Sequence, residues 1–328
     1  MLQAFGKSCR TAAPLLLAGS ALFCSTVAAQ NFPAKPIRIV MPFTPGGSTD
    51  LLARVIAQKM TEKWGQQNIV DNKPGAATIV ATEFAAKSPP DGYTLLFVTT
   101  AFAINPSLYK KLPYDTVRDL APVSLMTSSP NILVAHPALP ANSARDLIRI
   151  AKARPGELTY ASAGSGTAAH VSIELLQTMA GIKLEHIPYK GIPQASVDVM
   201  SGQVSMLITS LPNALPYMKL GRMKALGLTT AKRSATAPEI PTIAESGVPG
   251  YEASGWQGMM APAGTPREVI GKLNAEIVTI LQLPEVREKL AADGSEFIGS
   301  SPEQFAAHLK SEIAKWAKVV KDSGAKAD

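Results

Sequence analysis

The stretch IRIVMPFTPGGSTDLLARVI (residues 37–56) reads as a short β-rich run, a loop of glycines and hydroxyl residues, and an apolar helical pattern. A second stretch, LTYASAGSGTAAHVSIELL (residues 158–176), repeats that order. Ligands of open α/β sheets bind at the carboxyl ends of the strands, where helices present unpaired N–H groups. The two stretches therefore predict two α/β lobes, each offering one anion-binding turn to a shared cleft.

The same alternation of β-rich runs and helical patterns continues through the rest of the chain. The expected strands are residues 37–42, 68–71, 94–98, 132–135, 158–161, 184–187, 206–209 and 225–228. The expected helices are residues 49–63, 76–87, 144–153, 168–179, 194–200, 267–281 and 302–321. Ser143 followed by Asp146 predicts a capped helix start. Strands that alternate with helices favour α/β architecture with mainly parallel strands.

Composition excludes several classes of protein. The chain has 328 residues, of which 46% are apolar and 17% are charged, so it is folded, as two compact domains or one large one. Its two cysteines, Cys9 and Cys24, both lie near the N-terminus, which excludes a thiol nucleophile or cysteine-ligated metal farther along. The four histidines are at least 16 positions apart, so no histidine pair has metal-ligand spacing on a helix. We expect no cofactor and no metal.

Charge also limits the possible partners. The formal net charge is +7, but the basic residues are scattered and never occur three in a row. A nucleic-acid-binding protein would cluster them on one face or helix. The sequence therefore predicts no nucleic-acid partner.

Residues 1–29 have the layout of a secretory signal peptide. Lys7 and Arg10 precede an apolar stretch, residues 12–23, and small residues follow up to Ala29, where we expect cleavage. An uncleaved membrane anchor is the alternative, but the apolar stretch is shorter than the ~20 residues that span a bilayer. The sequence therefore predicts an exported protein.

An enzyme is the first functional alternative. Residues 164–169 (GSGTAA) match a dinucleotide-binding fingerprint, and Glu185 stands near the position of a ribose-binding acid. The match is mid-chain in an exported protein, however, and no acid–base group stands out for hydride transfer. Ser165 also lacks the spacing of a nucleophile elbow. We therefore expect no enzymatic activity.

The sequence allows two interpretations of Asp50 and two of His170. Asp50 follows the first loop, where it favours the helix dipole or else points into the cleft to meet a ligand. His170 lies on the first helical turn after the second loop, where it contacts a bound anion or donates to a neighbouring carbonyl.

With these loops laid out, the chain resembles the substrate-binding proteins of tripartite tricarboxylate transporters, also called Bug-type extracytoplasmic solute receptors. The resemblance covers nearly all of the chain after residue 30. It rests on residues 33–54 (PAKPIRIVMPFTPGGSTDLLAR), 71–78 (DNKPGAAT), 87–97 (KSPPDGYTLLF), 160–170 (YASAGSGTAAH), 187–191 (IPYKG), 209–234 (TSLPNALPYMKLGRMKALGLTTAKRS) and 255–266 (GWQGMMAPAGTP).

The resemblance implies a two-lobe periplasmic-binding-protein fold of type II, with the cleft between the lobes. Lobe 1 would contain residues 31–130 and 256–328, and lobe 2 residues 131–255. It also implies a monomer in the periplasm that captures a small organic carboxylate and delivers it to a membrane permease. A receptor that hands the same ligand to a sensor kinase is the first alternative, and an exported enzyme that acts on organic acids is the second.

By position in the matching stretches, the resemblance also implies a set of ligand-binding residues. In lobe 1 these are Phe43, Gly46, Gly47, Ser48, Asp50, Thr99 and Thr100, and in lobe 2 they are Ser162, Gly164, Ser165, Gly166, Thr167, His170, Thr209 and Ser210.

Two stretches depart from the family pattern. Ala77 and Thr78 stand where relatives often have glycine, and Ser205 and Thr209 where relatives often have aspartate. The missing acids remove a partner for a ligand ammonium group, which disfavours amino acids as ligands.

Overall fold

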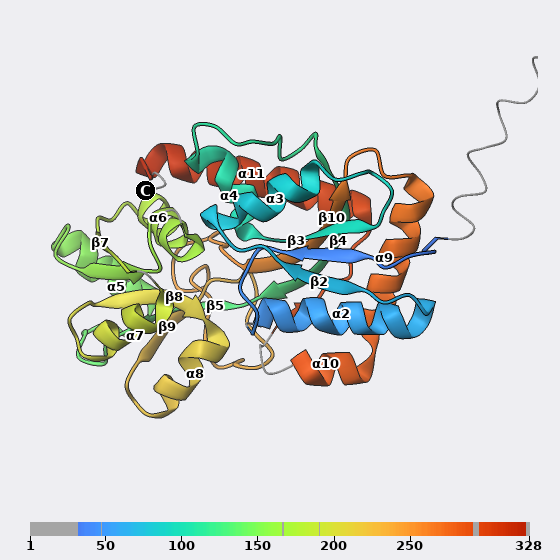
Figure 1. Cartoon of the computed structure of the whole chain (residues 1–328). Helices are drawn as coiled ribbons and strands as arrows, with labels where there is room; N and C mark the ends of the chain where they lie inside the picture. The colour runs from blue at the N-terminus through green and yellow to red at the C-terminus, as the bar shows by residue number, and fades with distance from the viewer. Residues whose placement is uncertain (1–31, 47, 166, 190, 291–294, 326–328) are drawn as a thin grey trace, which may run out of the picture.

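The computed structural model describes residues 32–325 apart from residues 47, 166, 190 and 291–294. Within this part of the chain, the strands form two sheets, A and B, which lie side by side with helices on their faces (Figure 1). The predicted α/β fold of two helix-flanked sheets is confirmed. The expected leader, residues 1–29, lies outside the described residues.

Sheet A has the strand order β11-β4-β10-β3-β1-β2. Its strands are β1 (Arg38–Met41), β2 (Ile69–Asn72), β3 (Thr94–Thr99), β4 (Leu120–Ser129), β10 (Gly255–Pro262) and β11 (Glu296–Phe297). Its helices are α2 (Ser48–Trp64), the short 3-10 helix η1 (Ala76–Thr78), α3 (Ile79–Ala86), α4 (Thr100–Leu108), α9 (Arg267–Gln282), α10 (Pro284–Leu290) and α11 (Pro302–Ser323).

Sheet B has the strand order β7-β6-β8-β5-β9. Its strands are β5 (Asn131–Ala135), β6 (Thr159–Ser162), β7 (Glu185–Pro188), β8 (Met206–Ser210) and β9 (Lys224–Leu228). Its helices are α5 (Ala144–Ala153), α6 (Ala168–Ala180), α7 (Ile192–Met200) and α8 (Leu211–Lys219). The chain passes from sheet A to sheet B between β4 and β5 and returns between β9 and β10.

Both sheets are mixed, which corrects the expectation of mainly parallel strands. Strand β1 is parallel to β2 and β3, and β6 is parallel to β7 and β8. The strands next to a crossing between the sheets run the other way: β10 is antiparallel to β3 and β4, and β5 is antiparallel to β8 and β9. Parallel neighbours need a crossover connection, but a helix between two strands does not by itself make them parallel.

Buried apolar side chains hold the elements in place. The helix expected over residues 49–63 forms as α2 and packs Leu52, Val55, Ile56 and Met60 into a core that it shares with sheet A and α9. A second core continues along α11 from sheet A to α6 and sheet B. Helix α11 therefore packs against elements of both sheets.

Capping residues fix where several helices begin. The Ser143 hydroxyl accepts a hydrogen bond from the Asp146 N–H at 3.2 Å, which confirms the capped start predicted for α5. Ser301 and Gln304 form a capping box at the start of α11.

Several regions differ from the sequence-based expectation. Residues 100–108, for which no helix was expected, form helix α4 with Pro106 inside it. Strands β4 and β10 were not predicted, because β4 contains Pro122 and several serines and β10 follows a long segment without clear periodicity. The helix expected over residues 76–87 begins only at Ile79.

Candidate functional site

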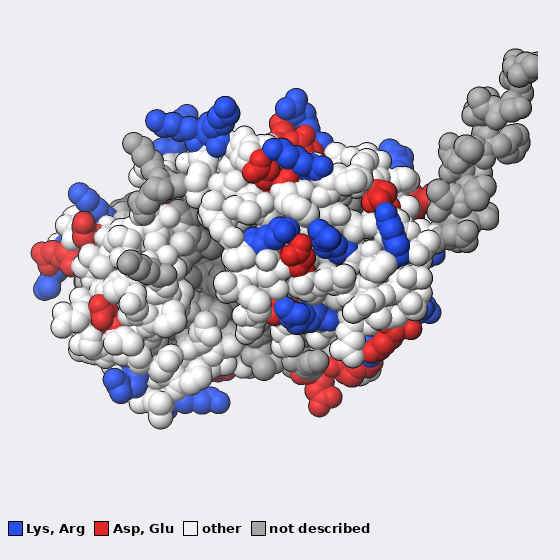
Figure 2. Space-filling view, viewed as in Figure 1, with Lys and Arg blue, Asp and Glu red and all other residues white. Residues whose placement is uncertain are grey.

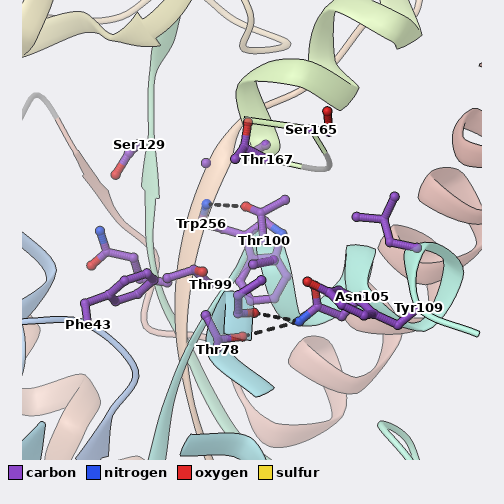
Figure 3. A pocket seen from close by; sticks show the side chains of 16 residues that line it. Phe43, Thr78, Thr99, Thr100, Asn105, Tyr109, Ser129, Ser165, Thr167 and Trp256 are labelled. Carbon is purple, nitrogen blue, oxygen red and sulfur yellow. Dashed lines mark hydrogen bonds between the residues drawn. The ribbon is translucent and has the colours of Figure 1, made fainter. Parts of the chain in front are cut away.

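A pocket of about 370 Å³ lies where the two sheets meet, a size typical of small-molecule sites. Figure 3 shows it with Ser165 and Thr167 of the α6 start on one side and Thr99 and Thr100 of the α4 start on another. Its lining comes from both sheets: Phe43, Ala77, Thr78, Thr99, Thr100, Ala101, Asn105, Leu108, Tyr109, Ser129, Ser165, Thr167, Ala168, Gly255, Trp256 and Gln257.

Helix α4 begins at the pocket. Thr99 ends β3 and is the N-cap residue of α4. Its side chain accepts no hydrogen bond from the first-turn N–H groups of the helix, so the cap residue leaves these groups unsatisfied. The Thr100 hydroxyl accepts a hydrogen bond from the Trp256 backbone N–H at 3.2 Å, which ties the start of α4 to β10 (Figure 3). The α4 start is thus a fixed source of partial positive charge beside the pocket.

Helix α6 begins at the pocket from the other sheet. Its cap, Thr167, donates a hydrogen bond to the Gly164 carbonyl at 2.8 Å and accepts one from the His170 N–H at 3.5 Å. Gly164 has a φ of 122°, a conformation that residues with a Cβ rarely adopt, and this φ turns the chain from β6 into α6. Two helix starts from two sheets therefore approach one pocket, an arrangement suited to an anion.

Hydrogen bonds of hydroxyl and imidazole groups stabilise the second loop, residues 162–167. The fully buried Ser162 hydroxyl contacts the Gly164 N–H at 3.1 Å and His186 Nε2 at 2.7 Å. The His186 ring stacks on the buried His170 ring, with 4.2 Å between ring centres. Behind them, burial raises the pKa of Glu174, which accepts a hydrogen bond from Tyr160.

The first loop, residues 43–48, is held by a carboxylate. Asp50 is buried and accepts hydrogen bonds from Arg54 Nε at 2.8 Å, Asn72 Nδ2 at 2.9 Å and the Gly46 N–H at 3.0 Å. Burial alone would raise the pKa of Asp50, but the hydrogen bonds and the Arg54 charge outweigh it and lower that pKa. These contacts give Asp50 a role that neither sequence-based interpretation included, as a support of the loop.

The segment after β2 reaches the pocket in an unusual conformation. Ala76, Ala77 and Thr78 all have positive φ, at 43°, 48° and 78°. Asn105 of α4 holds this segment by donating to the Ala77 carbonyl at 2.8 Å. Residues with a Cβ enter this region at a cost, and such strain often marks a functional site.

The predicted site residues fall into three groups. Phe43, Thr99, Thr100, Ser165 and Thr167 line the pocket. Seven others are not among its described lining residues: Gly46, Asp50, Ser162, Gly164 and His170 belong to the two loops and the helices that follow them, and Thr209 and Ser210 end β8. Ser48 begins α2, and Gly47 and Gly166 lie outside the described residues.

Sequence reasoning missed part of the lining. Gly255, Trp256 and Gln257 come from the strand that returns to sheet A, and Ala77, Thr78, Asn105, Leu108 and Tyr109 come from η1 and α4 or follow α4. The stretch GWQG at residue 255 was noticed only as part of the family resemblance. This stretch lies where the chain returns from sheet B to sheet A, and that position is the signal that could have indicated a place in the pocket.

Charged side chains do not concentrate at this site. Lysines and arginines are interspersed with acidic residues on the face shown in Figure 2, and the described lining of the pocket contains no Lys, Arg, Asp or Glu. Among the described residues, no group of three His, Cys, Asp or Glu could hold a metal ion. In the same part of the chain, no helix is both long and apolar enough to cross a bilayer.

Comparison with known proteins gives the family. The model of the tripartite tricarboxylate transporter family receptor matches residues 52–325. Protein BugT of Bordetella pertussis is 40% identical, over 95% of this chain and 98% of its own length. The solved structure of R. palustris Rpa4515 with adipate is 38% identical, with a TM-score of 0.78, and covers 90% of this chain and 100% of its own.

A further solved structure, MatC from Rhodopseudomonas palustris with bound malate, is 30% identical with a TM-score of 0.74, covering 88% of this chain and 100% of its own. The two mixed sheets are typical of a type II periplasmic binding protein, a class of solute-binding proteins without enzymatic activity. The chain therefore belongs to the TctC, or Bug, family of extracytoplasmic solute receptors.

Proposed function

We propose that this receptor binds a small organic carboxylate in the pocket between its two lobes. The observation that carries the proposal is that α4 from sheet A and α6 from sheet B both begin at this pocket. Their first-turn N–H groups and the hydroxyls of Thr99, Thr100, Ser165 and Thr167 are suited to carboxylate oxygens. We propose the lobe boundaries given above, residues 31–130 with 256–328 and residues 131–255.

Binding would proceed by closure of the lobes on the ligand. A carboxylate that meets one helix start would draw the other toward it, because each start carries about half a positive charge. Closure excludes water and strengthens both contacts. Micromolar affinity corresponds to about −8 kcal/mol, which a few charge-assisted hydrogen bonds and an enclosed apolar body can supply.

Solved relatives support a carboxylate ligand. The Rpa4515 structure contains adipate and the MatC structure contains malate, and both molecules are organic acids. These two proteins share the fold of this chain over about nine-tenths of its length.

We further propose that residues 1–29 direct export to the periplasm and are removed near Ala29, and that the mature monomer delivers its ligand to the permease of a tripartite transporter. Family membership supports both steps. Deletion of the gene should abolish uptake of the ligand and growth on it. Normal uptake after deletion would contradict delivery to a permease.

A thermal-shift screen of the mature protein tests ligand binding directly. Carboxylates are compared with their neutral amides, which have nearly the same shape but no charge. A carboxylate at 100 times its Kd should add about 2.7 kcal/mol to the free energy of unfolding and raise Tm by several degrees. Equal shifts with acids and amides, or no shift with any acid, would contradict the proposal.

A further inference from the structure

The pocket runs along one stripe of helix α4. Ala101, Asn105 and Leu108 are spaced i, i+4 and i+7, and all three line the pocket. At 1.5 Å per residue, the distance from Thr100 to Leu108 is about 12 Å. A ligand that touches both Thr100 and Leu108 therefore extends along the axis of α4.

This orientation gives the two ends of the pocket different electrostatic character. The start of α4, beside the start of α6, favours negative charge, whereas the end of α4 carries partial negative charge from its carbonyl groups. Leu108 and Tyr109 stand at that end. The dipole of α4 therefore opposes a second carboxylate there.

The side-chain amide of Asn105, near the end of α4, is already used, which leaves neutral hydroxyl groups such as that of Tyr109 as the side-chain donors there. The Asn105 side-chain amide donates to the Ala77 carbonyl at 2.8 Å and to the Thr78 hydroxyl oxygen at 3.4 Å (Figure 3). No cationic side chain is part of the described lining. A carboxylate placed there would lose its hydration without gaining a charged partner, which is costly.

Apart from hydroxyl groups, the remaining lining of this end is apolar. Ala77, Ala101, Leu108 and the ring of Tyr109 present carbon atoms to the pocket. Ala77 keeps its methyl group despite a φ of 48°, where glycine would be free of strain.

Resting on the proposed function, we infer that the receptor selects monocarboxylates with an apolar aliphatic or aromatic body. The carboxylate lies between the starts of α4 and α6, and the uncharged body lies along Ala101, Leu108 and Tyr109. Dicarboxylates of the same length are rejected by the end of α4.

Calorimetric titration of the mature receptor with hexanoate and adipate tests this inference, because the two acids have the same number of carbons and differ in the second carboxylate. Hexanoate should bind at least about tenfold more tightly than adipate. Equal or tighter binding of adipate overturns the inference but leaves the proposed function intact. If hexanoate, adipate and all other carboxylates of the thermal-shift screen fail to bind, both fall.

A substitution at Tyr109 tests the position of the apolar end. Tyr109→Lys places a cation at the end of α4, where the helix dipole favours it, and Tyr109→Gln is the neutral control. Tyr109→Lys should shift the ratio of adipate to hexanoate affinity toward adipate by about tenfold relative to Tyr109→Gln. An unchanged ratio in folded Tyr109→Lys, with the fold checked by circular dichroism, overturns the inference.

Discussion

The two loops that look alike in the sequence are held by different chemistry. The first loop depends on the ionised carboxylate of Asp50, which binds Arg54 and the Gly46 N–H. The second loop depends on the Ser162 hydroxyl and the His186 ring. Among the described lining residues, the second loop contributes hydroxyl groups, whereas the first contributes the ring of Phe43. A shared strand-loop-helix pattern therefore predicts a shared shape but not a shared role.

The largest expected effect comes from a charge at the second loop. Thr167→Asp keeps a good helix cap but places a negative charge beside the pocket. We expect ligand affinity to fall by about 100-fold or more, because like charges near 4 Å repel by several kcal/mol in a partly buried site. Calorimetric titration measures the loss.

The matched control for this substitution is Thr167→Asn, which has the same shape and also caps helices well. It should lose far less affinity than Thr167→Asp and should unfold at a similar temperature. Equal affinities of the two variants would mean that the α6 start does not face a negatively charged ligand.

A smaller effect is expected on stability, where substitutions of Asp50 and Ser162 compare the hydrogen bonds that stabilise the two loops. Asp50→Asn removes charge-assisted hydrogen bonds and should lower the free energy of unfolding by about 2 kcal/mol at pH 7. The matched change in the second loop, Ser162→Ala, removes neutral hydrogen bonds and should cost about 1 kcal/mol. Urea unfolding of both variants measures the difference.

The pH dependence gives this comparison a second readout. Because the pKa of Asp50 is lowered in the folded protein, its contribution is complete above the ordinary carboxylate pKa and is lost as pH falls through the lowered value. The deficit of Asp50→Asn relative to wild type should therefore shrink in acid. A deficit that stays constant down to pH 3 would show that the charge of Asp50 does not stabilise the first loop.

Local sequence signals predicted much of the fold. The apolar runs of β1, β3 and β8 and helix α2 appear at the predicted positions, because each buries a continuous or periodic set of side chains. Helix α4 was missed because Asn105 and Pro106 are poor residues for a helix interior, yet the packing of Phe102 and Ile104 in the core keeps it helical.

The pocket was harder to predict because its walls are distant in the sequence. Thr78, Thr100, Thr167 and Trp256 meet only once the chain has crossed twice between the sheets. No periodic pattern in the sequence indicates that these residues lie close together. The role of the α4 start, which faces the α6 start across the pocket, therefore became visible only in three dimensions.

A crystal structure of the receptor with its best carboxylate ligand tests the central claim most directly. We predict that oxygens of one carboxylate lie within hydrogen-bond distance of first-turn N–H groups of both α4 and α6. A carboxylate held by one helix start alone, or bound away from Thr100 and Thr167, would contradict the account.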